Sequence, residues 1–221
     1  MRCVKSRTNY WGPRHTGGGS EAVSWFRTLP SVSRIGIFGG TFDPVHVGHI
    51  AVAVRVQAAL QLDRVELMVA NEPWQKLDRP RLSPAQDRLA MVEAAVEDID
   101  GVVASSVEID RGGLTYTVDT LKAYRGDNPG VSLFLILGSD AAASIDTWHR
   151  YEEIAEMAEI VVVDRPGAMG QRPPVAHQVV DCPLLDLSST QVRQWADAGQ
   201  PLDGLIPPAA LSYIRQEGLY E

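Results

Sequence analysis

The segment that most constrains the fold of this chain runs from Arg34 to Ile50, with the sequence Arg-Ile-Gly-Ile-Phe-Gly-Gly-Thr-Phe-Asp-Pro-Val-His-Val-Gly-His-Ile. Its apolar run, 35–38, predicts a buried β-strand. Gly39 and Gly40 follow, where the backbone can turn or approach a ligand closely. A helical pattern begins at Val47. The segment therefore predicts a strand, a glycine loop and a helix, an arrangement that directs backbone N–H groups towards an anion.

Two histidines occupy the turn between this strand and this helix. His46 and His49 are three residues apart, so both lie on one face of the first helical turn. An imidazole pair at a helix N-terminus supplies N–H donors, and positive charge when protonated, to a reacting phosphate. A structural role and a metal-binding pair are the alternatives. We assign no metal site, because the sequence offers no third ligand close to the two histidines.

The composition is that of a protein with one well-packed core. The chain has 221 residues, of which 45% are hydrophobic, and this is enough for one domain. Nothing approaches the run of about 18 apolar residues that a membrane-spanning helix needs, so no membrane is predicted as a partner. Only two cysteines occur, Cys3 and Cys182, so we expect no disulfide framework and predict a cytoplasmic location.

Charge is distributed unevenly along the chain. The net charge is −8, yet residues 1–33 contain five Lys or Arg and only one Asp or Glu. The remainder is strongly acidic, which argues against nucleic acid as a partner. Residues 1–33 also contain a linker-like Gly17-Gly18-Gly19-Ser20 and no hydrophobic periodicity. We interpret them as a flexible extension or a misassigned start, and predict that residues 34–221 form one domain.

Strands and helices are predicted to alternate through most of the chain. Apolar runs favour further strands at 65–70, 102–107, 131–137 and 160–163, and residues 167–178 are predicted to be loop. Helical patterns follow Ser83, cover 116–124 and 154–157, and begin again at Ser188 and Pro207. This alternation predicts an α/β fold, a Rossmann-like three-layer sandwich with a mostly parallel sheet.

Two helix starts carry a capping-box pattern, one at Ser83 with Gln86 and the other at Ser188 with Gln191. The second start, Ser-Ser-Thr-Gln-Val-Arg, is also a candidate anion site, because hydroxyls and unpaired N–H groups gather there. Arg193 can add a fork of donors to a polyphosphate. A capped helix with a surface arginine is the alternative interpretation.

The string Gly-Gly-Thr-Phe-Asp-Pro-Val-His-Val-Gly-His at 39–49, followed late in the chain by Ser-Ser-Thr-x-x-Arg at 188–193, resembles the nucleotidyltransferases named for their His-x-Gly-His motif. Among these, the chain is similar to the nicotinate-nucleotide adenylyltransferases of bacteria, and to an actinobacterial form in particular. The stretches that carry this similarity are Pro73-Trp74-Gln75-Lys76, 110–117, Asp119-Thr120-Leu121, 144–148 and Arg165-Pro166-Gly167. The resemblance extends from Arg34 to Tyr220 and implies a fold of the nucleotidyltransferase type.

The resemblance implies a role for each matching position. ATP would be bound by Gly39, Gly40, Thr41, Phe42, His46, His49, Gly138, Asp140, Ser189, Thr190 and Arg193. The acceptor would be bound by Lys76, Tyr116, Thr117 and Trp148. Catalysis would depend on His46, His49, Lys76 and Arg193, with Mg²⁺ bound together with ATP.

The implied reaction is adenylyl transfer from ATP to nicotinate mononucleotide, which gives deamido-NAD and pyrophosphate by in-line attack without a covalent intermediate. The attacking phosphate is already ionised, so no general base is expected. Phosphopantetheine and nicotinamide mononucleotide are rival acceptors, and a non-catalytic nucleotide-binding regulator is a rival from another class. The sequence leaves open whether the chain forms a homo-oligomer.

The chain departs from the family just before Pro73. Ala70-Asn71-Glu72 is shorter than the Pro-x-Gly-type turn that the family often has at this point. An acidic Glu72 beside an anionic substrate would be unfavourable. We therefore expect this chain to differ from the family more on the acceptor side of the site than on the ATP side.

Overall fold

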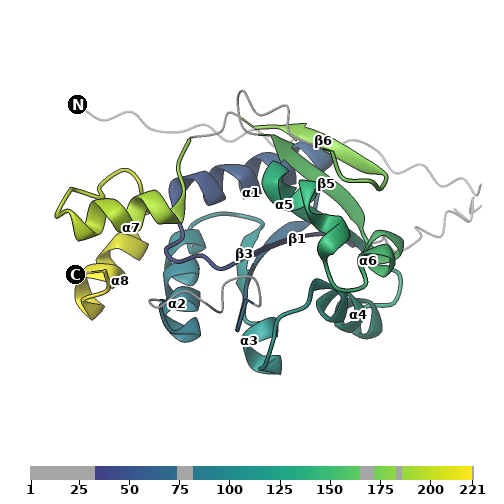
Figure 1. Cartoon of the computed structure of the whole chain (residues 1–221), viewed down its shortest axis with the longest axis horizontal. Helices are drawn as coiled ribbons and strands as arrows, with labels where there is room; N and C mark the ends of the chain where they lie inside the picture. The colour runs from purple at the N-terminus through teal and green to yellow at the C-terminus, as the bar shows by residue number, and fades with distance from the viewer. Residues whose placement is uncertain (1–32, 74–81, 165–171, 183–185, 221) are drawn as a thin grey trace, which may run out of the picture. The chain divides into compact units, whose positions relative to one another are not determined.

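Six parallel strands form one sheet in the computed structural model, which describes residues 33–73, 82–164, 172–182 and 186–220 (Figure 1). The strand order is β3-β2-β1-β4-β5-β6, and each neighbouring pair is parallel. The strands are β1 (Arg34–Gly40), β2 (Arg64–Val69), β3 (Val102–Ser105), β4 (Ser132–Gly138), β5 (Glu159–Asp164) and β6 (His177–Asp181). The predicted α/β class is confirmed, with a sheet that is parallel throughout the described residues.

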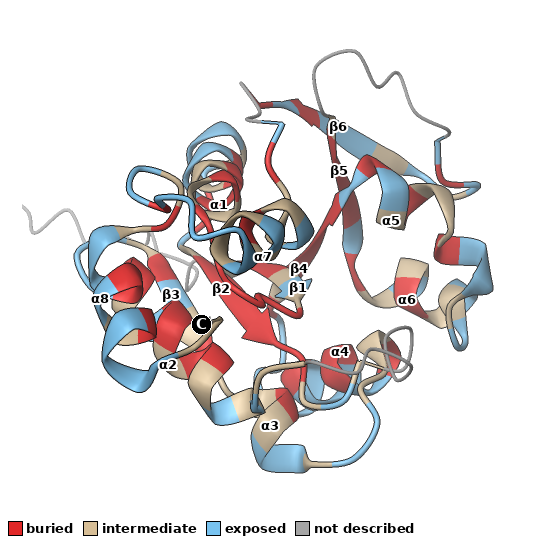
Figure 2. Cartoon of the chain, turned by 60° about the vertical axis from the view of Figure 1, so that its left-hand side comes forward, coloured by how far each residue is buried: buried red, intermediate tan, exposed pale blue. Residues whose placement is uncertain are grey.

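Helices cover both faces of the sheet and complete the three predicted layers (Figure 2). α1, α2, α7 and α8 pack on one face, and α4, α5 and α6 pack on the other. The helices are α1 (Val47–Leu60), α2 (Ala85–Val96), α3 (Val107–Arg111), α4 (Thr117–Asp127), α5 (Ser139–Ala143), α6 (Tyr151–Met157), α7 (Ser189–Asp197) and α8 (Pro208–Glu217), with a 3₁₀ turn at Ile145–Thr147. Within the described ranges, none of them combines the length and apolar character that crossing a bilayer would require.

The two central strands, β1 and β4, lie side by side and are buried on both faces. Ile35 and Ile37 of β1 pack into the core under α4, whereas Phe134 and Ile136 of β4 pack into the core under α1 and α2. Because both faces are covered, these strands read as continuous apolar runs, which is why the sequence predicts them well. The chain proceeds from β1 towards one edge and from β4 towards the other, so the crevice between them is the topological switch point of the sheet.

At the edges of the sheet, the end of one predicted strand and the end of one predicted loop differ from the structure. β3 ends at Ser105, opposite Met68 of β2, and Val107 instead begins the short helix α3. β6 occupies part of the segment 167–178 that was predicted to be loop. As an edge strand it has mostly exposed side chains, so it lacks the apolar run by which a buried strand is detected.

The capping box predicted at Ser83 and Gln86 is not formed. Pro84 is the N-cap residue of α2, and the side chain of Gln86 is exposed. The hydroxyl of Ser83 instead donates a hydrogen bond to the phenol oxygen of Tyr220 over 3.2 Å. A tertiary contact thus replaces the local one that the pattern predicts.

One buried arginine ties together the loops at the carboxyl end of the sheet. Arg88 of α2 is only 1% exposed. Its guanidinium donates to four main-chain carbonyls, those of Thr41 (2.8 Å), Ala70 (2.7 Å), Asn71 (2.9 Å) and Ser83 (2.9 Å). Burial lowers the pKa of this guanidinium, and the nearby Asp43 acts against that shift. The loop after β1 and the segment after β2 are therefore fixed to each other through one side chain.

Replacing Arg88 tests how much these contacts stabilise the fold. Arg88→Met keeps most of the apolar stem but leaves buried carbonyls without donors, and we expect it to lower the free energy of unfolding by about 3 kcal/mol. Urea denaturation of both proteins measures the difference. Arg55→Met is the control, because Arg55 is exposed and bonds only the carbonyl of Asp181 among the described residues. An Arg88→Met variant as stable as this control would contradict the role of Arg88.

Candidate active site

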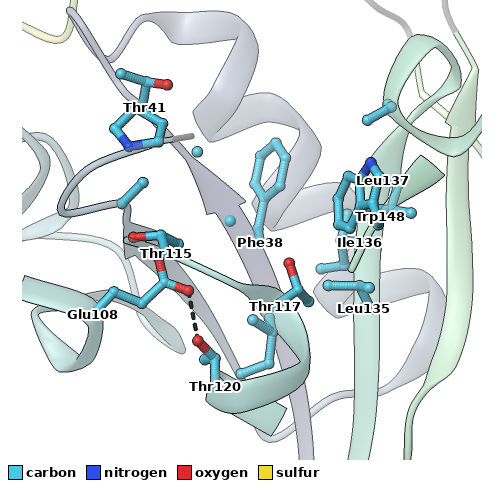
Figure 3. A pocket seen from close by; sticks show the side chains of 17 residues that line it. Phe38, Thr41, Glu108, Thr115, Thr117, Thr120, Leu135, Ile136, Leu137 and Trp148 are labelled. Carbon is cyan, nitrogen blue, oxygen red and sulfur yellow. Dashed lines mark hydrogen bonds between the residues drawn. The ribbon is translucent and has the colours of Figure 1, made fainter. Parts of the chain in front are cut away.

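A cavity opens at the switch point, at the carboxyl ends of β1 and β4 (Figure 3). Its volume is about 250 Å³. The lining residues come from the ends of β1, β2 and β4, from α3, and from the segments that precede and begin α4, with Ala141 and Trp148 on the β4 side. Open parallel sheets bind ligands at this place, so the cavity lies where the sequence predicted a site.

The structure brings part of the predicted set into this cavity. The predicted residues that line it are Gly39, Gly40, Thr41, Gly138, Thr117 and Trp148. Asp140 follows Gly138 but is exposed and does not line the cavity, and Tyr116 packs against His149, with ring centroids 4.8 Å apart. Lys76 and Arg165-Pro166-Gly167 lie outside the described residues, as does nearly all of the predicted N-terminal extension, 1–33.

Gly39 and Gly40, predicted to form a loop, are instead the last two residues of β1, and each is needed for a different reason. Phe42 is 2% exposed, adopts a φ of 51°, and folds its ring back over the strand end. A Cβ atom on Gly40 would lie 2.7 Å from this ring, so no larger residue fits there. At Gly39 nothing described lies within 4 Å of the corresponding position, and this glycine lines the cavity. Gly40 therefore permits the packing of Phe42, and Gly39 leaves room for a ligand.

The two histidines of the motif stack on each other at the start of α1. His46 is the N-cap residue, and its ring centroid lies 3.7 Å from that of His49. The backbone N–H of His46 donates to Nδ1 of His49 over 3.2 Å. Because Nδ1 accepts this bond, the neutral ring of His49 carries its proton on Nε2, where it can donate to a ligand oxygen. A Cβ on Gly48 would lie 3.0 Å from Nδ1 of His46, so glycine is favoured between the two rings.

The second motif contacts the first directly. The capping box at Ser188 and Gln191 is formed, as predicted. One residue further on, the hydroxyl of Ser189 donates to the carbonyl of Pro44 over 2.9 Å. Arg193 donates to the carbonyl of Asp43 and to the hydroxyl of Thr190. Two segments about 145 residues apart in the sequence are thus in direct contact through these hydroxyl and guanidinium groups.

No pattern in the sequence indicates that Tyr220 contacts the histidine loop. The carboxylate of Asp43 is 3% exposed and accepts a hydrogen bond from Tyr220 over 2.6 Å. It also lies 3.8 Å from the guanidinium of Arg193. Burial and the adjacent carboxylate raise the pKa of Tyr220 above its ordinary value, so the phenol stays protonated and acts as the donor. The motif contains Asp43 but gives no signal for its partner, which is 177 residues away.

A buried carboxyl group, also missed, lines the cavity near the start of α4. Glu108 of α3 is 5% exposed and accepts a hydrogen bond from the hydroxyl of Thr120 over 2.7 Å (Figure 3). Thr115 also bonds to it. Burial raises the pKa of the Glu108 carboxyl, and the hydrogen bonds and Arg111 act in the opposite direction. By contrast, Glu72 is exposed and does not line the cavity, so the expected conflict with an anionic substrate is absent from the cavity itself.

Trp148 offers a hydrogen-bond donor at the cavity. Its buried indole N–H has no hydrogen-bond partner among the described residues. No group of three or more His, Cys, Asp and Glu side chains in the described ranges is arranged to hold a metal ion. The carboxylate of Asp43, three residues before His46, accepts a hydrogen bond from Tyr220.

Comparison with known proteins shows which family the chain is similar to. The pattern of the family described as cytidylyltransferase-like matches residues 37–195. A probable nicotinate-nucleotide adenylyltransferase of Mycolicibacterium vanbaalenii is 39% identical over 197 residues, covering 85% of this chain and 92% of that protein. One of Saccharopolyspora erythraea is 42% identical over 190 residues, covering 85% and 89%.

A solved structure with a similar fold is the nicotinic acid mononucleotide adenylyltransferase of Plasmodium falciparum complexed with NaAD. It superposes with a TM-score of 0.72 at 20% identity and covers 85% of this chain and 97% of its own. At that identity the likeness supports the fold.

The buried Glu108 carboxyl gives a test by pH. Its pKa is raised above the ordinary value of 4.5 in the folded protein, so the folded state holds the proton more tightly than the unfolded chain does. The free energy of unfolding must therefore fall as pH rises from 4.5 through the raised pKa. Glu108→Gln removes this titration, so we expect the variant to gain stability relative to the wild type as pH increases. Urea denaturation between about pH 4 and pH 8 measures this. Parallel pH profiles would contradict it, and Glu93→Gln, at an exposed position, is the control.

Proposed function

The chain belongs to the nicotinate-nucleotide adenylyltransferases of the cytidylyltransferase-like family, and from this premise we propose how its residues carry out the reaction. The enzyme transfers the adenylyl group of ATP to nicotinate mononucleotide, releasing pyrophosphate and forming nicotinate adenine dinucleotide, a late step of NAD biosynthesis. What remains to be assigned is the work of individual side chains.

The proposal rests mainly on the stacked pair of His46 and His49. The loop that precedes them is hydrogen-bonded to Ser189 and Arg193 of the second motif. The neutral ring of His49 has its proton on Nε2, and Ser189, Thr190 and Arg193 lie at the start of α7 beside that loop. Such an array of donors suits the triphosphate of ATP. Gly39, with open space before it, admits the nucleotide against the backbone, and Asp140 is proposed to meet the ribose.

The acceptor is proposed to occupy the part of the cavity between Thr117 and Trp148. The unpaired indole N–H of Trp148 suits an anionic or carbonyl oxygen on the pyridine ring. Tyr116 stands next to Thr117 at the start of α4 and completes the predicted acceptor set, together with Lys76, which lies outside the described residues.

The chemistry needs positioning more than proton transfer. The phosphate of the acceptor is ionised at neutral pH, so it can attack the α-phosphate of ATP in line without a general base. Catalysis then rests on orientation and on donors that neutralise the charge growing on the α-phosphate and the leaving pyrophosphate. His46, His49, Lys76 and Arg193 are the proposed donors.

Mg²⁺ is proposed to arrive with ATP. Phosphate oxygens and water would be its main ligands. It would add charge neutralisation at the phosphates. The cytoplasmic location and a possible homo-oligomer remain predictions.

The acceptor assignment is tested by pyrophosphate release from ATP and Mg²⁺ with three acceptors in parallel. We expect a strong preference for nicotinate mononucleotide over nicotinamide mononucleotide and phosphopantetheine. Preference for nicotinamide mononucleotide would contradict nicotinate mononucleotide as the acceptor. Activity with only phosphopantetheine would contradict the activity as a nicotinate-nucleotide adenylyltransferase. No pyrophosphate release with any of the three would favour a nucleotide-binding regulator.

The role of His49 is tested by separating its two hydrogen bonds. His49→Ala removes both, whereas His49→Asn keeps a side-chain acceptor for the backbone N–H of His46 but has no group at the position of Nε2. If Nε2–H donates to phosphate in the transition state, both variants lose about 100-fold in kcat with little change in KM for ATP.

Steady-state kinetics with varied ATP separates the alternatives. Recovery of kcat in His49→Asn would show that His49 acts only by accepting a hydrogen bond from the backbone N–H of His46 at the start of α1. A large rise in KM with normal kcat would show that His49 only binds ATP.

A further inference from the structure

Asn71 joins the end of β2 to the wall of the cavity on the acceptor side. Its side-chain amide donates to the carbonyl of Gly113 over 3.0 Å, and its backbone N–H donates to the hydroxyl of Thr115 over 3.1 Å. Its own carbonyl accepts from the guanidinium of Arg88 over 2.9 Å. Three polar groups of one residue thus reach two segments, the turn at 113–115 and helix α2.

The next residue extends this connection. Glu72 and Leu114 form an isolated parallel bridge, in which the N–H of Thr115 donates to the carbonyl of Glu72 over 3.2 Å. The two joined segments carry four of the cavity-lining residues, which are Ala70, Pro73, Thr115 and Thr117. The separation of these segments therefore sets the width of the cavity on this side.

The turn at Gly112 and Gly113, which precedes Thr115, is hydrogen-bonded to the side chain of Asn71. Gly112 and Gly113 adopt φ values of 71° and 68°, a left-handed conformation that glycine enters freely. No described atom lies within 4 Å of where a Cβ would stand on either of them, and the N–H of Gly112 is bonded to the carbonyls of Glu108 and Ile109 in α3. The amide of Asn71 holds the carbonyl of Gly113 and so fixes the turn relative to β2.

Asn71 also connects the cavity wall at Thr115 to the loop after β1, through Arg88. Arg88, which binds the carbonyl of Asn71, also binds the carbonyl of Thr41 over 2.8 Å. Thr41 lines the cavity from the β1 side. A continuous series of hydrogen bonds thus runs from the loop proposed for ATP, through Arg88 and Asn71, to Thr115.

We propose that Asn71 is a positioning residue for the acceptor, acting through the turn at Gly113 and the wall at Thr115. Asn71 does not line the cavity and is not proposed to touch substrate. The inference rests on nicotinate mononucleotide being the acceptor, as proposed above.

Asn71→Ala is the central variant. It removes only the bond to Gly113, since the bonds to Thr115 and Arg88 involve the backbone. With saturating ATP, we expect kcat/KM for nicotinate mononucleotide to fall about threefold to tenfold, the worth of one hydrogen bond, while KM for ATP stays within about twofold. Asn71→Asp keeps the size but cannot donate to a carbonyl, so we expect at least the same loss.

Glu72→Gln is the matched control. Glu72 is the adjacent residue, is exposed, and bonds the wall only through its backbone among the described residues, so its substitution is expected to leave both substrates unaffected. Calorimetric titration with nicotinate mononucleotide alone gives a second readout, in which weaker binding is expected for both Asn71 variants.

The outcomes separate the inference from its premise. A fall in kcat/KM for the acceptor alone supports the positioning role. An Asn71→Ala variant that matches Glu72→Gln, or one that loses thermal stability and affinity for both substrates together, would overturn it. A wild-type protein that does not use nicotinate mononucleotide at all would overturn the proposed acceptor instead.

Discussion

The buried guanidinium of Arg88 is the interaction on which both halves of the site depend. Burying a cation is costly unless it is fully hydrogen-bonded, and here four main-chain carbonyls and the nearby Asp43 offset that cost. Carbonyls at strand ends have no ladder partner of their own, so the arginine satisfies them and at the same time fixes their spacing. The loop after β1 and the segment after β2 are thereby held by one rigid planar group.

The histidine loop is restrained from several directions at once. Tyr220 holds the carboxylate of Asp43, while Arg193 and Ser189 hold the carbonyls of Asp43 and Pro44. The carbonyl of Leu205 accepts from the first N–H of α1. These contacts fix the main chain of the histidine loop in one position relative to α7, Leu205 and Tyr220.

Most of the central architecture could be predicted from the sequence, since β1, β4, α1 and α7 have local signals. An apolar run marks a strand that is buried on both faces, and a capping box marks the start of α7. β6 and α3 were missed because an exposed edge strand and a short helix carry little hydrophobic periodicity. At Ser83 a local signal was present but the capping box did not form. The hydroxyl of Ser83 instead donates a hydrogen bond to the distant Tyr220.

The sequence by itself determined the strand, turn and helix at 34–60, the histidine pair and the Ser-Ser-Thr-x-x-Arg start, because each depends on residues only a few positions apart. Only the tertiary structure decided that Tyr220 would restrain Asp43, that Glu108 would be buried in the cavity wall, and that Asn71 would hold Gly113. Those pairings join residues between 42 and 177 positions apart or depend on burial, and local periodicity carries no information about either.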